Sequence, residues 1–255
     1  MNVAAFFARI GNKILSAIVV IFIMLMFLYG GYSLWDTAML YKGAFISNDL
    51  LEFKPSLDEP DAPTLSELIK LNPDVRGWLT VDDTHIDYPV VQGKNDMEYI
   101  NKDVYGEFAL SGSIFMDSRN SEDFSDSYNL LYGHNMSNGA MFGDIVKFVN
   151  ADYFNSHKTG ILFTSGGVNY SLELFACVEI DAFNSVIYNP TAQEQGNIQP
   201  LLDYIQSIAV QYRDVNVGAQ DKVIGLSTCA EAETNGRVVV FGKMIQLEQV
   251  QEGGN

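Results

Sequence analysis

Three side chains at the ends of apolar segments have the types needed for nucleophilic catalysis. Cys229 ends "KVIGLSTC" and precedes a polar stretch, His134 ends "YNLLYGH", and Arg237 opens the next apolar run. A cysteine that attacks a carbonyl group needs a partner that exchanges protons and a donor that stabilises the oxyanion. Histidine exchanges protons near neutral pH, and arginine donates hydrogen bonds while keeping its charge. The three residues together predict cysteine-dependent acyl chemistry.

Each of these residues also has a simpler interpretation. Cys177 and Cys229 are the two cysteines of the chain, and in an oxidising compartment they could form one disulfide. Against this, Cys177 lies inside "YSLELFACVEI", where a buried cysteine acts as a small hydrophobic residue. His134 could be a structural histidine, and Arg237 a strand-end charge that faces water. The remaining histidines are interpreted as surface or edge residues, His85 and His157.

A series of short apolar segments predicts the strands that position these side chains. The segments are separated by Gly, Asp, Asn and Ser, and Gly166-Gly167 suits a hairpin turn. They cover residues 77–81, 85–92, 112–117, 128–134, 160–165, 168–180, 222–229 and 237–250. Because strands and helices do not alternate, the pattern favours a mainly β closed barrel or sandwich over a parallel α/β sheet.

A few helical segments interrupt the strands. Residues 64–71 ("TLSELIKL") and 140–149 ("AMFGDIVKFV") predict short helices. A longer helix is predicted near 197–212, with Pro200 tolerated in its opening turn. The chain has no internal repeat or low-complexity tract, so these elements are assigned to one domain.

The N-terminal segment predicts a membrane anchor. From Ile14 to Trp35 there are 22 residues without a charge, which is enough for a transmembrane helix. Arg9 and Lys13 precede this run, so residues 1–13 are predicted to be cytoplasmic and the rest of the chain extracellular. A cleaved signal peptide fits less well, because the run is longer than a usual signal core and no small-x-small cleavage site follows it. Residues 36–63 are interpreted as a linker with a short helix.

The charge of the exported part excludes one class of partner. All 32 acidic residues but only 13 of the 15 basic ones follow Trp35, which gives 13 − 32 = −19 formal charges. Such a surface repels nucleic acid. The Asp/Ser-rich stretch 117–127 lacks the spacing of a calcium loop and is interpreted as a solvated turn. No metal or organic cofactor is indicated.

The motifs around the three candidate residues resemble the sortases, a family of cysteine transpeptidases on Gram-positive cell surfaces. "LSTC" at 226–229 with Arg237 downstream, and "YGHNM" at 132–136 followed by "MFG", carry the resemblance. The stretch "GWLTVDDTHIDYPVVQGKNDMEYINKD" (77–103), "GSIFMD" (112–117) and the helical insertion before the cysteine are similar to class B members. The resemblance extends over about residues 65–248.

The resemblance implies a fold and a role for particular residues. The fold is a closed β-barrel of about eight strands with N-terminal helices, formed by a catalytic domain at 64–250 and preceded by the transmembrane helix at 14–35. Cys229 is then the nucleophile, His134 the general acid/base, and Arg237 the donor to the oxyanion or substrate carbonyl. Four further residues are expected to line the substrate groove by similarity: Ile100, Ile187, Ser227 and Thr228.

Two positions depart from the family pattern. Gly225 stands where a threonine often opens the cysteine motif, so the packing of this strand is expected to differ. Glu231 stands where class B members often have an aspartate, and it is interpreted as a solvent-facing loop carboxylate.

The activity implied by the resemblance is transpeptidation at the cell surface. The enzyme would cleave a C-terminal sorting signal (NPxTx-like or xPxTG-like) of a secreted protein through a thioacyl intermediate. It would then join that protein to an amine of a peptidoglycan precursor. Two alternatives remain open at this point: a surface cysteine peptidase that uses water as acceptor, and a non-enzymatic binding barrel with a disulfide.

Overall fold

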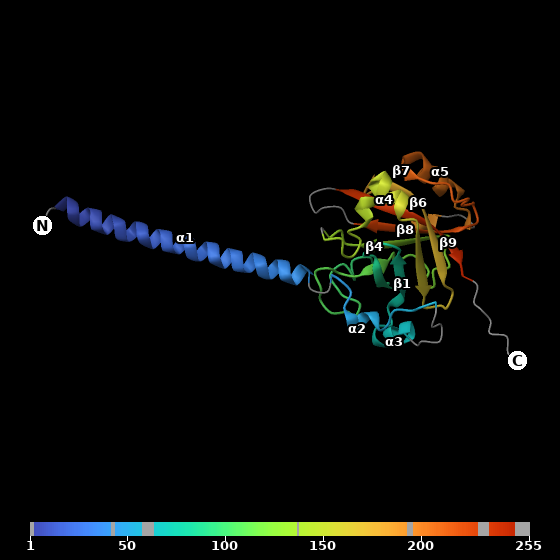
Figure 1. Cartoon of the computed structure of the whole chain (residues 1–255), viewed down its shortest axis with the longest axis horizontal. Helices are drawn as coiled ribbons and strands as arrows, with labels where there is room; N and C mark the ends of the chain where they lie inside the picture. The colour runs from blue at the N-terminus through green and yellow to red at the C-terminus, as the bar shows by residue number, and fades with distance from the viewer. Residues whose placement is uncertain are drawn as a thin grey trace. The chain divides into compact units, whose positions relative to one another are not determined.

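A computed structural model describes residues 3–41, 44–57, 64–136, 138–192, 196–228 and 235–247. The chain divides into two units, Met1–Lys42 and Gly43–Asn255. The elements (Figure 1) are α1 (Val3–Tyr41), α2 (Asn48–Leu51), α3 (Thr64–Leu71), β1 (Val75–Val81), β2 (Asp87–Val91), β3 (Ile114–Met116), β4 (Tyr128–Gly133), η1 (Ile145–Val149), α4 (Ala151–Ser156), β5 (Thr159–Thr164), β6 (Tyr170–Asp181), η2 (Pro190–Ala192), α5 (Gln199–Ile208), β7 (Ala209–Tyr212), β8 (Lys222–Thr228) and β9 (Gly236–Gln246).

The first unit is a single long apolar helix. Helix α1 has 39 residues, and its segment Phe6–Met39 is long and apolar enough to cross a membrane, with a mean hydropathy of 2.6. None of that segment is buried within the structure. The span predicted at 14–35 lies inside this helix. A run of apolar side chains that no protein core covers is what a bilayer-spanning helix presents to lipid.

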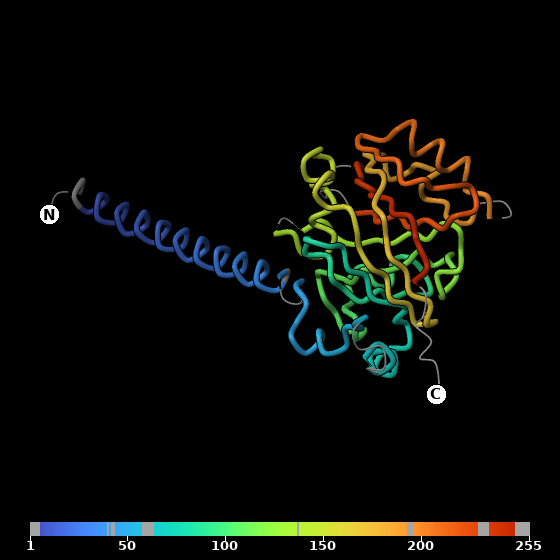
Figure 2. The backbone as a smooth tube through the Cα atoms, turned by 45° about the vertical axis from the view of Figure 1, so that its right-hand side comes forward, coloured from blue at the N-terminus to red at the C-terminus, as the bar shows by residue number. Residues whose placement is uncertain are grey.

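The second unit is built on a closed sheet. Its strand order is β5-β1-β2-β3-β4-β8-β9-β6-β7, and a further pairing of β5 with β6 closes the ring. Strand β7 pairs with β6 outside that ring, so eight of the nine strands form the barrel. Figure 2 shows β9 and β6 running side by side over most of their length, in an antiparallel pairing. The mainly β closed barrel predicted from the sequence is confirmed.

Alternation along the strands divides the apolar side chains between the barrel interior and an outer layer. In β8, Ile224 and Leu226 belong to the cluster that contains side chains from every strand of the ring. Val223 belongs to a second cluster, which packs under helix α5. A strand covered on both faces needs apolar residues at successive positions, which explains why "VIGL" is a continuous apolar run. Because β8 is buried on both sides, its end is held rigidly.

Two predicted helices have different boundaries in the structure. The segment predicted as one helix at 140–149 forms turns followed by the short 3-10 helix η1 at 145–149. Helix α5 ends at Ile208, and residues 209–212 form strand β7 instead of a last helical turn. Main-chain groups of this segment pair with the open edge of β6. The edge of the sheet therefore overrides a helical pattern that continued to Tyr212. Helix α3 at 64–71 and the turn at Gly166-Gly167 agree with the sequence.

The structure gives a physical reason for Gly225. A Cβ atom at this position would lie 2.9 Å from Tyr128 Oη and 3.1 Å from Leu130 Cδ1. Tyr128 is fully buried, and its hydroxyl donates a 3.0 Å hydrogen bond to the Ile187 carbonyl. The tyrosine ring thus occupies the space of the threonine side chain found in many family members.

Substitution of threonine at this position is expected to destabilise the fold. Gly225→Thr forces the Tyr128 ring away from its hydrogen bond, and such overpacking costs about 1–3 kcal/mol of the free energy of unfolding. The measurement is denaturant unfolding of the full chain in detergent. Gly166→Thr is the matched control, because its new Cβ would meet no atom closer than 3.7 Å. Equal stability of the two variants would contradict the packing argument.

Candidate active site

Parallel pairing of β4 with β8 brings the last residues of both strands to one edge of the barrel. Tyr132 is opposite Ser227, and Gly133 is opposite Thr228. His134 is the next residue after Gly133, and Cys229 is the next after Thr228. The two strands therefore end beside each other, about 4.8 Å apart as paired strands are. Cys229 itself lies outside the described residues, as does Glu231.

Arg237 enters the same region from the next strand. It lies near the start of β9, which pairs with β8 through Ser227 and Val239 and with β6 through Ile180. Its side chain is half-buried, and Nη1 donates a 2.9 Å hydrogen bond to the Gly236 carbonyl. Arg237 and Thr228 both line a cleft of about 690 Å³. Strand β4 precedes His134 in the chain, β8 precedes Cys229, and β9 contains Arg237. These three strands are consecutive in the sheet.

The His134 ring is oriented by a main-chain carbonyl. Its Nε2 atom lies 2.8 Å from the Ile100 carbonyl oxygen. A carbonyl oxygen only accepts, so Nε2 carries a hydrogen, and Nδ1 is the accepting nitrogen in the neutral ring. The His134 carbonyl in turn accepts a 3.0 Å hydrogen bond from the Phe142 amide. The ring is thus held on one side and has a second nitrogen suited to proton exchange.

The buried carboxylate of Asp144 stabilises the loop that follows His134. Asp144, only 1% exposed at its side chain, lies 2.7 Å from Lys147 Nζ and 2.8 Å from His85 Nδ1. It also accepts a 2.8 Å hydrogen bond from the His85 amide. Burial alone would raise the pKa of Asp144, but the hydrogen bonds from Lys147 and His85 outweigh it and hold this pKa below its usual value. The partly exposed His85 is therefore a structural contact for this loop.

The structure places the four predicted groove residues in different surroundings. The Ile100 side chain is half-buried, and its carbonyl contacts His134. Ser227 is buried with Oγ 3.0 Å from Tyr188 Oη, and the buried Thr228 borders the cleft. Ile187 is fully buried in the cluster under α5, so its side chain belongs to the core there. An apolar groove residue and an apolar core residue look alike in a sequence, which is why Ile187 was expected on the groove.

Cys177 differs sharply from a catalytic cysteine. It is a free thiol with no exposed surface, packed in the cluster inside the barrel. Because Cys177 is free, the structure gives no support to the disulfide with Cys229 that the sequence left open. Burial and the nearby Glu179 carboxylate raise the pKa of the Cys177 thiol to about 12. Because the thiolate is the reactive form, Cys177 is inert near neutral pH.

Thiol labelling is expected to distinguish the two cysteines. At pH 8, well below the raised pKa of Cys177, a water-soluble alkylating reagent should add one label to the folded full chain. The label should lie on Cys229, and two labels should appear after unfolding in urea. Mass spectrometry of peptides measures both. Labelling of Cys177 in the folded chain at a rate similar to that of Cys229 would contradict its burial.

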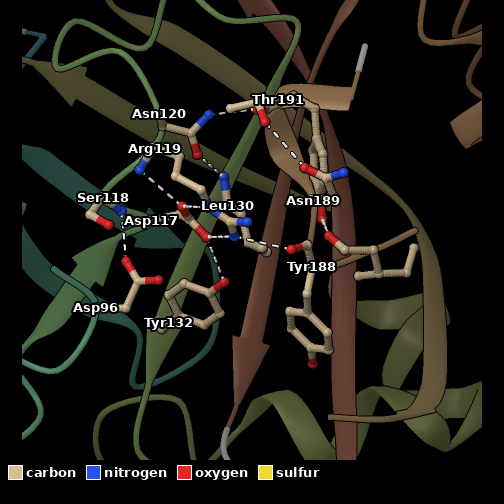
Figure 3. Close-up of polar contacts among 12 residues, drawn as sticks. Asp96, Asp117, Ser118, Arg119, Asn120, Leu130, Tyr132, Tyr188, Asn189 and Thr191 are labelled. Carbon is tan, nitrogen blue, oxygen red and sulfur yellow. Dashed lines mark hydrogen bonds and ion pairs between the residues drawn. The ribbon is translucent and has the colours of Figure 1, made fainter. Parts of the chain in front are cut away.

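The stretch 117–127 is not the fully solvated turn expected from its composition. The Asp117 side chain has no exposed surface, and Asp117 accepts hydrogen bonds from Arg119 and Tyr132 (Figure 3). Burial alone would raise the pKa of Asp117, but the Arg119 bonds and the Tyr132 hydroxyl hold it below its usual value. A composition rich in Asp and Ser is typical of exposed turns. The one sequence feature that could have indicated burial of Asp117 is the arginine two residues later, Arg119.

Comparison with known proteins settles the family. A family model described as the sortase domain matches residues 79–245. The chain belongs to the sortase family. This confirms the resemblance found in the sequence, and the matched region begins in β1 and ends in β9. As a sortase, the protein is a cysteine transpeptidase of the kind that sorts proteins to the cell wall.

Among the described residues, no group of three or more His, Cys, Asp and Glu side chains could hold a metal ion.

The similar proteins are class B sortases, as the sequence predicted. Sortase B of Listeria monocytogenes is 38% identical over 184 residues, which is 71% of this chain and 74% of that protein. A Streptococcus pyogenes class B sortase involved in pilus biogenesis is 41% identical, with a TM-score of 0.65, and the match covers 71% of this sortase and 97% of that one. A Staphylococcus aureus sortase B–substrate complex is 32% identical, with a TM-score of 0.67 and coverage of 73% and 86%.

Proposed function

We propose that this sortase is a membrane-anchored transpeptidase in which Cys229, His134 and Arg237 act together on a C-terminal sorting signal. The observation that carries the proposal is the order of strands β4, β8 and β9, with Gly133 opposite Thr228. That register supports a short separation between His134 and the residue that follows Thr228. The cleft bordered by Thr228 and Arg237 supports a substrate at the same edge.

The first half of the proposed reaction forms a thioester. The Cys229 thiolate attacks the carbonyl carbon of the residue before the scissile bond, for example the threonine of an NPxTx or xPxTG signal. The tetrahedral intermediate carries its negative charge on oxygen, and the Arg237 guanidinium donates to it. His134, which has taken the proton of the Cys229 thiol, gives it to the leaving amine as the C–N bond breaks. The substrate protein is then held as a thioacyl enzyme, and the C-terminal fragment departs.

The second half transfers the acyl group to an amine. An amine of a peptidoglycan precursor attacks the thioester carbon, His134 takes the proton that the amine loses, and the Cys229 thiolate leaves. The same histidine thus donates a proton in one half and accepts one in the other, and Nδ1 can do both while Nε2 stays bonded to the Ile100 carbonyl. Water in place of the amine would give a free acid, which is the product of a peptidase.

The anchor places this chemistry where secreted proteins emerge. Residues 14–35 would span the membrane with 1–13 in the cytoplasm, because Arg9 and Lys13 lie on the N-terminal side of the run. Residues 36–63 would link the span to an extracellular catalytic domain at 64–250. The excess of acidic residues after Trp35 argues against nucleic acid as a partner.

The experiment is a product analysis with the full chain in detergent. Peptides of the NPxTx, SPxTG and LPxTG types are incubated with and without an added amine of the kind found in cell-wall peptides, and the products are identified by mass spectrometry. We expect one peptide class to be cleaved and the acyl fragment to become an amide when amine is present. Formation of the free acid alone in both conditions would favour the peptidase.

The two cysteines offer a matched control for the nucleophile. Cys229→Ala should abolish cleavage and amide formation. Cys177→Ala makes the same chemical change at a buried, inert position and should retain activity. Turnover by Cys229→Ala, or cleavage of no peptide by the parental chain, would overturn the proposed function.

A further inference from the structure

The short segment after β3 contacts several parts of the site at once. Both carboxylate oxygens of Asp117 are occupied: Oδ1 accepts from Arg119 Nε at 2.8 Å and from the Arg119 amide at 3.0 Å. Oδ2 accepts from Arg119 Nη2 at 2.6 Å and from Tyr132 Oη at 2.8 Å. Tyr132 precedes His134 by two residues on β4. Figure 3 shows the Arg119 guanidinium lying between Asp117 and the Tyr188 main chain.

Arg119 also reaches the turn between β6 and η2. Its Nη2 atom donates a 3.0 Å hydrogen bond to the Tyr188 carbonyl as well as the bond to Asp117. Nη2 carries two hydrogens, so both acceptors are satisfied by one nitrogen. The bidentate pairing with Asp117 fixes the plane of the guanidinium and therefore the direction of the second hydrogen.

The carbonyl, ring and hydroxyl of Tyr188 each contact a different part of the chain. Its carbonyl accepts from Arg119, its ring stacks on Tyr132 with centroids 6.3 Å apart and planes at 19°, and its hydroxyl lies 3.0 Å from Ser227 Oγ. Ser227 is two residues before Cys229 in the chain. The position of Tyr188 relative to the end of β8 consequently depends on Arg119, a residue that lies on none of these strands.

The same segment contacts the loop on the histidine side. The Ser118 amide donates a 2.7 Å hydrogen bond to Asp96 Oδ1. Asp96 lies four residues before Ile100, whose carbonyl orients the His134 ring. Segment 117–119 therefore joins the loop around Ile100, strand β4 and the turn between β6 and η2, three parts that are distant in sequence.

We propose that Arg119 is a positioning residue that fixes the half-buried Tyr188 next to Ser227, where Tyr188 would contact the acyl-donor peptide. This inference rests on the proposed function. Among the described residues, Arg119 bonds to Asp117 and to the main chain of Tyr188, and not to His134 or Arg237. The strands next to His134 and Arg237 are placed by their own backbone pairing. Loss of the Arg119 contact should therefore weaken binding of the acyl-donor peptide and leave the chemical steps of bound peptide nearly unchanged.

Arg119→Lys tests the proposal, because lysine keeps a positive charge near Asp117 but loses the planar fork that serves both acceptors. We expect KM for the cleaved peptide to rise about tenfold, as for loss of one hydrogen bond to a charged group, while kcat changes less than about threefold. Arg213→Lys is the matched control. Arg213 also donates to main-chain carbonyls, those of Leu174 and Phe154, in another part of the barrel.

Two further measurements distinguish a positioning role of Arg119 from a role in folding and from a role in the chemical steps. Peptide affinity measured in the Cys229→Ala background, where no turnover occurs, should fall by a similar factor when Arg119→Lys is added. If Arg119→Lys fails to fold, Tyr188→Phe removes only the hydroxyl contact to Ser227 and should also raise KM. A parental chain that cuts peptide while Arg119→Lys shows an unchanged KM, or a loss confined to kcat, overturns this inference alone. A parental chain that cuts no peptide overturns the proposed function and this inference together.

Discussion

His134→Ala lowers kcat/KM for sorting-signal cleavage by about 10²–10⁴-fold, the range of general acid/base catalysis. The leaving amine departs as a strongly basic fragment unless it receives a proton, and alanine supplies none. The effect should be on kcat, because the ring contacts a main-chain carbonyl at Ile100 and takes no part in holding the barrel together. Steady-state kinetics with the cleaved peptide measures it.

His157→Ala is the control for this prediction. His157 stacks on Tyr153 with ring centroids 3.7 Å apart and contacts the Asp83 carbonyl, away from the β4 and β8 ends. Its removal should leave kcat within about a factor of two, in line with a surface substitution. Equal losses for the two histidines, or full activity of His134→Ala, would assign the proton transfer to another group.

Arg237→Lys lowers kcat/KM by about 10²–10³-fold, the usual effect of losing one oxyanion donor. The charge is kept, so the expected loss comes from geometry: a guanidinium presents several donors in a fixed plane, and an ammonium group acts as a point charge on a flexible stem. Position 237 is held by pairing of β9 with both β6 and β8, and a shorter reach cannot be compensated by movement of the strand.

Arg76→Lys is the corresponding control on strand β1. Arg76 pairs with Glu122 at 3.4 Å and contacts the Pro73 carbonyl. Strand β1 pairs with β2 and β5 and with neither β8 nor β9, so the kinetic constants should be close to those of the parental chain. If Arg237→Lys retained full activity, a positive charge alone would be sufficient at this position, and directed donation to the oxyanion would be excluded.

The barrel could be predicted from the sequence because its strands are short apolar segments separated by clear turn residues. The apolar run before Cys229 and the run before His134 predicted two strand ends, and the structure pairs those strands in parallel. Strand β7 was missed because a helical pattern continued to Tyr212, while the available edge of β6 depends on tertiary structure. Long-range pairing of this kind leaves no local signal.

The contacts around the site were less predictable than the strands. Ile187 is apolar whether it lines a groove or fills a core, and only the position of α5 decides that it is buried. The carboxylate of Asp117 lies in a stretch rich in Asp and Ser, and its burial follows from Tyr132 and Arg119 meeting it in space. Side chains that act through partners distant in sequence are therefore the part that requires a structure.

Parallel pairing of β4 and β8 has a consequence for how this enzyme can diversify. Parallel neighbours need a long crossover, and here it runs from His134 to Lys222 and includes β5, β6, α5 and β7. The offset between the two strand ends is set by their own hydrogen-bond ladder and not by the length of that crossover. Insertions and substitutions in the crossover can remodel what is recognised while the reacting groups keep their spacing, so substrate choice and bond-making chemistry are free to evolve separately.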